Sequence, residues 1–445
     1  MSVDHAAARQ CNVPVTDAAA LKATTALIFL GCLAISAFSM ATAAQAHVKW
    51  FVACDSSEEP LPLQAVFTPP FWLFSALFVA LFYLTCKFER TTLGAALSSR
   101  FDHCTRHLHH RTDDLLRAAA AISFALLWAD GGVILTPELK GSTIWLSAIQ
   151  VLIPAYLFGR ATLPAAATGV FVLYGLGIAT YGLFHMLDYP VFLGLGAYFA
   201  LSVSRDPRLL AFRFDCVRWG VALTLMWPSM EKFLYPGWVA PIAAAHPQIT
   251  MGFDVATFIT AAGVVEFGLA FALFWTPLVR RLAALALALL LVGAMFEFGK
   301  TDGIGHLMIV AILLVMVADP DTQRNRHYPA LAPLMSGVAL LAMLFLYTGA
   351  HTLYYGSWRA AVIPLINGAA LLAAGLLYVS GLAFTLSAAA ARLFDGRHVD
   401  GSSEADGDAD HAQADLRHRP WAIDLELLNE SAAGGTATPH RRHEW

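Results

Sequence analysis

Charged residues are scarce in this chain of 445 residues: Asp, Glu, Lys and Arg together make up 13%, about half the share that is typical of a soluble domain. The formal net charge is only −4, which indicates no basic surface for a nucleic-acid partner. Hydrophobic residues make up 58% and fall in long runs separated by short polar breaks. Because a membrane span takes about 20 mostly apolar residues, we predict an all-α, polytopic transmembrane helix bundle that is surrounded by lipid bilayer.

Recognised catalytic motifs are missing as well. The sequence has no glycine-rich phosphate loop, no nucleophile elbow and no haem attachment motif. Its six cysteines are not spaced like metal ligands, and only Cys54 is expected at the outer face, so we expect no intramolecular disulfide. A redox activity would therefore need a centre supplied by a partner subunit, and whether the chain is an enzyme stays open.

The first segment, 1–46, is predicted to be a signal peptide or an uncleaved anchor helix. Its apolar run ends in Ala44 and Ala46, and small residues at these two positions match a signal-peptidase site. Both interpretations place His47 at the outer face. The Lys49-Trp50-Phe51 stretch that follows is expected to rest at the membrane interface as an aromatic anchor.

Hydropathy predicts eleven further spans, near 67–86, 115–135, 143–159, 163–184, 189–204, 218–234, 255–277, 282–298, 304–318, 329–348 and 361–385. If the segment from Lys87 to Arg117 is cytoplasmic, most of the 28 basic residues are cytoplasmic too. The outer face then keeps only Lys49, Lys140, Lys232, Lys300 and Arg359. We therefore expect a multi-pass protein of the bacterial inner membrane with a cytoplasmic carboxyl terminus.

Two stretches of four spans each, 115–215 and 216–320, look alike and indicate an internal duplication. Trp128-Ala-Asp-Gly-Gly-Val-Ile-Leu-Thr-Pro137 aligns without a gap with Trp227-Pro-Ser-Met-Glu-Lys-Phe-Leu-Tyr-Pro236. Because each copy starts in the cytoplasm and crosses four times, the repeats are predicted to be parallel. Further aligned pairs are Gln150 with Glu266, Phe158 with Phe274, Phe184 with Phe298, and Asp188 with Asp302.

Flanking segments complete the predicted organisation. Residues 47–114 form a periplasmic stretch, one span and a basic cytoplasmic segment. Residues 321–393 form two more spans, and 394–445, rich in Gly, Ser, Asp and Ala, form a disordered cytoplasmic tail.

The second copy carries a recognisable pattern. Arg218-x-Gly220 opens a helix that ends in Glu231-Lys232, and Glu266 follows in the next helix. In this pattern the copy resembles the DoxX/DoxD family of four-helix membrane proteins. The first copy is degenerate, with Gly132-Val133 in place of the Glu-Lys pair. Some relatives are linked to thiosulfate oxidation with electrons passed to quinone, so the resemblance implies a redox or respiratory role beside a quinone and a redox partner.

The ionisable residues of the second copy form the candidate site. Glu266 is the deepest carboxylate, so it is expected to be protonated or paired, either as a structural acid or as a proton-relay or quinone-site acid. Trp227 shares a helix face with Glu231 and is a candidate cofactor contact, whereas Lys232 points elsewhere and is expected to snorkel. Asp130, His185 and Asp188 of the first copy lie at the same depth. The proposed proton or quinone site consists of Glu266, Glu231, Lys232, Glu297, Lys300, Asp302 and His306.

Three functions follow from these residues. The leading one is a DoxX-like inner-membrane component of a redox or respiratory pathway that interacts with quinone at the periplasmic face. The second is a copper-handling protein, because His47, if cleavage leaves it first in the chain, could chelate one copper ion through its amine and ring nitrogen. The third is a proton-coupled transporter built on the duplicated bundle, with Glu266 as the proton site.

Overall fold

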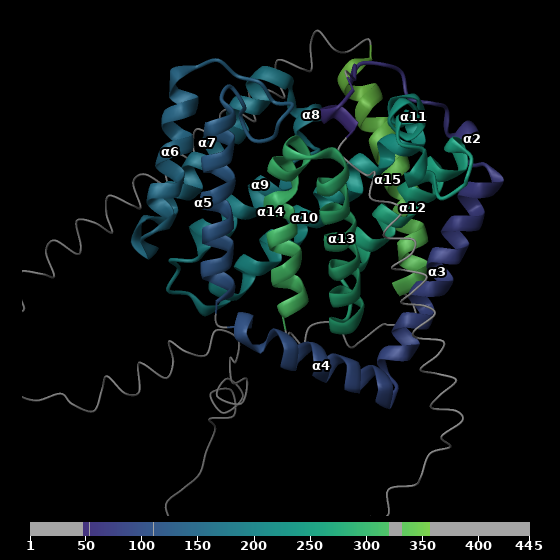
Figure 1. The fold of residues 1–445 in the computed structure, drawn as a ribbon, viewed down its shortest axis with the longest axis horizontal. Coiled ribbons are helices and arrows are strands. Elements are labelled where there is room, and N and C mark those ends of the chain that lie inside the picture. Colours follow the sequence, from purple (N-terminus) through teal and green to yellow (C-terminus); the bar gives the residue numbers. More distant parts are fainter. Residues whose placement is uncertain (1–47, 53, 110, 320–331, 357–445) are drawn as a thin grey trace, which may run out of the picture.

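The computed structural model describes residues 48–52, 54–109, 111–319 and 332–356. These residues form an all-α bundle whose long helices run side by side (Figure 1), and within them the only bridge of β type joins Val133 and Lys140. The predicted leader 1–46, His47, the last predicted span at 361–385 and the tail 394–445 lie outside the described residues.

The prediction of a polytopic membrane bundle is confirmed. In the described part of the chain, six helices are long and apolar enough to cross a membrane, and α6 and α9 are shorter apolar helices. Apart from the span at 361–385, which lies outside the described residues, every span that hydropathy predicts after the leader overlaps a helix. The helices at these spans are α3 (Pro69–Glu89), α5 (Thr112–Asp130), α6 (Ile144–Leu157), α7 (Leu163–Tyr181), α9 (Pro190–Leu201), α10 (Pro207–Leu234), α12 (Val255–Ala272), α13 (Pro277–Phe298), α14 (Lys300–Ala318) and α15 (Ala332–Tyr355).

Local sequence signals set several helix ends. Proline stands in the first turn of α3, α9, α10 and α13, where its missing N–H has no helical partner to lose. Gly182 and Gly299 follow α7 and α13 with φ of 84° and 74°, a backbone conformation that favours glycine. The remaining elements are η1 (Val48–Trp50), α2 (Leu63–Val66), α4 (Thr92–His109), η2 (Arg160–Thr162), α8 (Leu183–Met186), α11 (Pro236–Ala245) and η3 (Pro247–Thr250).

The two predicted repeats appear as two groups of four helices with the same order of neighbours. In the first group α5, α6, α7 and α9 pack in succession, and in the second group α10, α12, α13 and α14 do the same. The groups meet where α9 packs along α10 and where α14 packs against α5. The first helix of each copy therefore contacts the last helix of the other, as expected for parallel repeats related by an axis along the bundle.

A matching polar contact supports the duplication. Gln150 donates from Nε2 to the carbonyl oxygen of Val133 over 2.5 Å. In the second copy, Glu266 is aligned with Gln150 and Lys232 with Val133, and here Lys232 Nζ donates to Glu266 Oε2 over 2.5 Å. The same two positions are therefore joined in both copies, although only the second copy uses charged groups.

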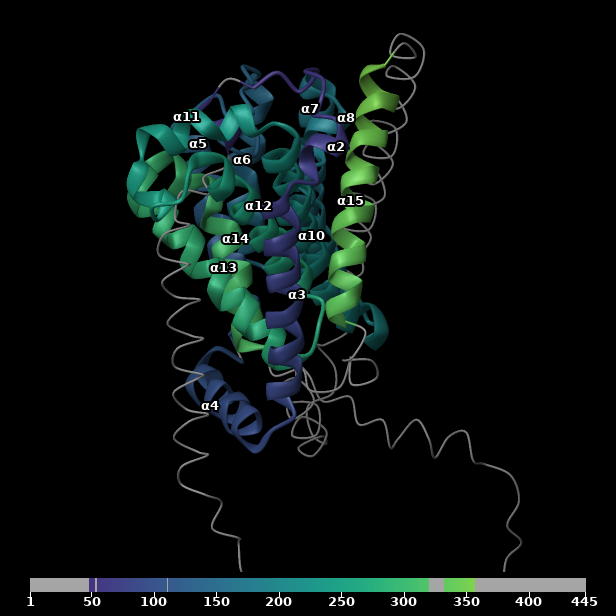
Figure 2. The same ribbon diagram turned by 90° about the vertical axis from the view of Figure 1, so that its right-hand side faces the viewer.

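Helix α4 lies across one end of the bundle (Figures 1 and 2), packed on α13 and α14. Arg281, which is buried in α13, holds it there by donating to the carboxylate of Asp102 over 2.6 Å. The opposite end, reached by the loops around α8 and α11, is called the outer end below.

Candidate functional site

The segment η1 inserts between the two repeats at the outer end. Val48 is buried, and the side chain of Lys49 is only 4% exposed. The indole of Trp50 stacks on His306 with ring centroids 4.6 Å apart, and it lies so close to Gly305 that a Cβ there would collide with it. The expectation of an interfacial aromatic anchor is therefore wrong for Lys49 and Trp50, because both side chains enter the bundle.

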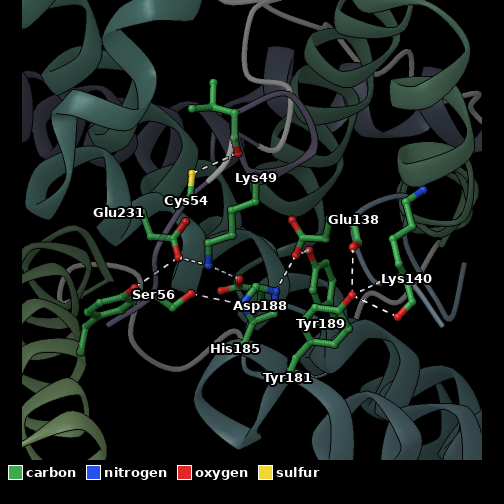
Figure 3. Close-up of polar contacts among 12 residues, drawn as sticks. Lys49, Cys54, Ser56, Glu138, Lys140, Tyr181, His185, Asp188, Tyr189 and Glu231 are labelled. Carbon is green, nitrogen blue, oxygen red and sulfur yellow. Dashed lines mark hydrogen bonds and ion pairs between the residues drawn. The ribbon is translucent and has the colours of Figure 1, made fainter. Parts of the chain in front are cut away.

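Lys49 joins the two repeats through two carboxylates (Figure 3). Its Nζ lies 2.6 Å from Asp188 Oδ2, in the turn between α8 and α9, and 2.6 Å from Glu231 Oε1 on α10. The side chains of both acids are almost completely buried. The ammonium also lies 5.7 Å from the ring centroid of Trp238, a distance at which the ring face attracts a cation.

A second acid–base group adjoins this ion pair in the first repeat. His185 Nε2 lies 2.8 Å from Glu138 Oε1, and the hydroxyl of Tyr189 donates to the same oxygen. On its other side, His185 Nδ1 lies 3.1 Å from Ser56 Oγ. One ligand atom each from Glu138, His185 and Asp188 lie within 4.8 Å of one another, a spacing that suits a metal ion. We assign no metal here, since the Lys49 ammonium, 2.6 Å from Asp188, would repel a metal cation at this position.

The second repeat contributes two buried pairs. Lys232 and Glu266 form the 2.5 Å contact described above, and His306 Nδ1 lies 2.9 Å from Asp302 Oδ2. Lys232 is only 6% exposed, so the expectation that it snorkels is wrong. A cavity of about 30 Å³, room for one or two water molecules, is lined by Glu231, Lys232, Glu266 and His306 together with Thr224 and apolar side chains.

These groups are called the inter-repeat network. The network consists of Lys49, Glu138, His185, Asp188, Glu231, Lys232, Glu266, Asp302 and His306. Five carboxylates thus face two lysines and two histidines. Even with both histidines charged, one negative charge remains unbalanced, and an uncompensated buried charge is costly. The network is therefore expected to hold at least one proton on a carboxyl group.

Asp188 is the group best placed to hold this proton. Burial raises the pKa of Asp188, the neighbouring Glu231 carboxylate raises it further, and Lys49 opposes them, which brings the pKa to about 7. Burial lowers the pKa of Lys49, but the carboxylates of Asp188, Glu231 and Glu138 raise it by more, so that the pKa lies well above its usual value. Lys49 therefore stays an ammonium, while Asp188 exchanges a proton near neutral pH.

The structure brings most of the predicted site residues together. Glu231, Lys232, Glu266 and His306 line one cavity, and Asp302 is bonded to His306. Trp227 is buried but does not line this cavity; its ring packs on Tyr347, 4.7 Å between centroids.

Two predicted members lie in separate, more exposed pairs. Glu297 Oε1 is 2.6 Å from His246 Nδ1, and Lys300 Nζ is 2.7 Å from Asp130 Oδ1. The side chain of Lys300 is 73% exposed. Both residues lie near the outer ends of their helices, as predicted, but their partners lie outside the buried acid–base groups, and Lys300 reaches across to the end of α5 at an exposed position.

Lys49 and Glu138 are the functional candidates that the sequence did not single out. Both lie outside the long helices, where hydrophobic periodicity carries no information about which way a side chain points. The one available signal was that Lys49 is among the few basic residues on the outer side.

Comparisons with protein-family models, with curated proteins and with solved structures find no match, so the DoxX/DoxD resemblance stays a prediction.

The raised pKa of Asp188 predicts a pH-dependent stability. A carboxyl group whose pKa is raised on folding stabilises the fold fully below its unfolded pKa, and this contribution is lost as the pH rises through about 7. We expect the melting temperature to fall between about pH 5 and about pH 8. Asp188→Asn should flatten this slope, because an amide cannot ionise.

Thermal unfolding in detergent, followed by tryptophan fluorescence at several pH values, measures the slope. Asp130→Asn is the matched control, since Asp130 sits in an exposed pair with Lys300. Equal slopes in wild type and Asp188→Asn would contradict the assignment.

Proposed function

We propose that the protein exchanges protons with the aqueous phase at its outer face, as the proton-handling component of a membrane redox pathway in the bacterial inner membrane. The observation that carries the proposal is the excess of carboxylates in the buried inter-repeat network, centred on Lys49 between Asp188 and Glu231. Because neutrality requires a proton there and Asp188 releases it near neutral pH, the network suits reversible proton uptake.

The cavity in the network is sized for water. Its volume of about 30 Å³ accepts one or two water molecules, whereas pockets for organic ligands usually measure about 300–1,000 Å³. The quinone and the redox partner implied by the DoxX/DoxD resemblance would therefore exchange protons with the network from outside this cavity.

A proton-coupled transporter is the second candidate. It is favoured by the position of the network, which lies between two parallel repeats as coupling-ion sites of many transporters do. The copper alternative stays a prediction, since His47 lies outside the described residues.

Quinol-dependent proton release by bacterial membranes that contain the full chain tests the proposal, with membranes lacking the chain as background. We expect Glu266→Gln and Asp188→Asn to reduce this release, because each removes an acid of the network. Glu297→Gln makes the same change in an exposed pair outside the network and should retain the release.

Release that is equal in all three variants and in wild type would overturn the proposal. Proton flux driven by a membrane potential in proteoliposomes of the protein alone, without quinol, would instead support the transporter.

A further inference from the structure

Two neighbouring cavities, which share two lining residues, adjoin the inter-repeat network. The first is the one lined by Lys232, Glu266 and His306. The second, about 10 Å³, is lined by Trp50, Thr136 and Tyr189 among others, and is close to the smallest volume that holds one water molecule. Both cavities are lined by Thr224 and Ile309. Of these two shared residues only Thr224 has a hydroxyl group.

One lining residue of the second cavity, Tyr189, belongs to the acid–base group of the first repeat. The Tyr189 hydroxyl donates to Glu138, which contacts His185, and His185 in turn contacts Ser56. The side chain of His185 is 13% exposed, so this half of the network reaches the aqueous phase. In the other half, the side chains of His306 and Asp302 are more deeply buried than that of His185, at 5% and 0% exposed.

Lys49 links the two halves by charge but is a poor proton carrier. A carrier must give up its proton and take another, and the surrounding carboxylates hold the pKa of Lys49 well above its usual value. Protons that move between the halves therefore need a route beside the ammonium.

Thr224 has the chemistry for this route. Its Oγ1 accepts a hydrogen bond from the Val191 N–H over 2.8 Å, which leaves its own O–H hydrogen free to donate. Four residues later on α10, Pro228 has no N–H to bond the carbonyl oxygen of Thr224. Pro228 also lines the first cavity. At this point the Thr224 hydroxyl can therefore donate, and the Thr224 carbonyl lacks its usual helical partner.

We propose that Thr224 is the positioning residue that passes protons between the two halves of the network, through water molecules in the two cavities. In each transfer the hydroxyl gives its hydrogen to water in one cavity and receives one from water in the other, so the residue ends unchanged. The inference rests on the proposed proton exchange and adds its internal path.

The test follows two histidines after a rapid change of pH, in the full chain. His185 reports the outer half, and His306 reports the half behind Thr224. His306 faces Asp302 on its own helix, Glu231 and Lys232 on α10, and Glu266 on α12. Time-resolved infrared spectra of protein with isotope-labelled histidine rings would separate the two, with each signal assigned from the His185→Gln and His306→Gln variants.

Thr224→Val removes the hydroxyl and keeps the shape. We expect it to slow protonation of His306 by about 100-fold, the lower end of what a positioned proton-transfer group contributes, and to leave the rate at His185 as in wild type. Thr224→Ser keeps a hydroxyl and should restore the rate at His306 to within a few fold. If Thr224 had a purely structural role, Thr224→Val would change the melting temperature but would not slow protonation of His306 selectively over His185.

Rapid protonation of His306 in Thr224→Val would overturn the path while leaving proton exchange itself intact. If neither histidine nor any buried carboxyl group changes protonation in wild type, the proposed function and the path both fail.

Discussion

Replacing Lys49 with Met is expected to destabilise the fold by about 3–5 kcal/mol at neutral pH, the usual cost of removing one partner of a buried ion pair. The substitution leaves the carboxylates of Asp188 and Glu231 facing each other without a cation. Lys300→Met is the matched control, because Lys300 is paired but 73% exposed, and exposed pairs contribute about 0–1 kcal/mol. Reversible unfolding in mixed detergent micelles measures both free energies.

Two further results would identify the cause of the stability loss in Lys49→Met. The penalty for Lys49→Met should shrink as the pH falls, because protonated carboxyl groups no longer need the ammonium. Adding Asp188→Asn and Glu231→Gln should recover much of the stability by removing the unpaired charges. A cost for Lys49→Met no greater than that for Lys300→Met would show that Lys49 is not the central counterion.

The pair of Lys232 and Glu266 should behave as one unit. Lys232→Met and Glu266→Gln each leave one buried charge unpaired, so each is expected to cost about 3–5 kcal/mol. The double variant should cost much less than the sum, since a buried pair that is replaced as a whole is often neutral. A double-mutant cycle provides the measurement, with Lys300→Met and Asp130→Asn as the exposed control cycle.

Additive costs of Lys232→Met and Glu266→Gln would contradict a buried ion pair between these two residues. They would mean that Lys232 and Glu266 find other partners when the structure relaxes.

Most of the fold could be predicted because lipid imposes a simple rule on sequence. Apolar runs of span length become helices, as α12 and α14 show, since an unpaired backbone is too costly in hydrocarbon. Helix α10 was predicted from 218 but begins at Pro207. Hydropathy misses this first part because it is polar, whereas the cap at Asp206, which accepts from the N–H of Arg208, sets the start of the helix.

The site could be predicted only in part, because hydropathy gives the depth of a residue but not its partners. Glu266 was expected to be paired or protonated, and its contact with Lys232 agrees with that. Glu297 was predicted to belong to the same site as Glu266, but in the structure it pairs with His246 outside the network. Lys49 and Asp188 are 139 residues apart in the chain, and no local pattern reports a contact over that separation.

The duplication is the sequence feature that came closest to the geometry. It aligned Asp188 with Asp302. In the structure Asp188 lies beside Lys49, and Asp302 lies beside His306, whose ring stacks with Trp50. Lys49 therefore reaches Asp188 itself, whereas Trp50 reaches the histidine that is bonded to Asp302. An alignment of repeats can identify such positions, but it cannot reveal that a segment outside the repeats fills the space between them.

Infrared difference spectroscopy of the purified full chain tests the central claim most directly, by following the stretching band of a protonated carboxyl group as the pH is varied. The proton-holding network predicts such a band in wild type at about pH 5 to 6, where exposed carboxyl groups are ionised. The band should be lost as the pH rises through about 7 and be absent from Asp188→Asn over the same range. A wild-type spectrum without that band between about pH 5 and 6, or with a band that Asp188→Asn leaves unchanged, would contradict the account.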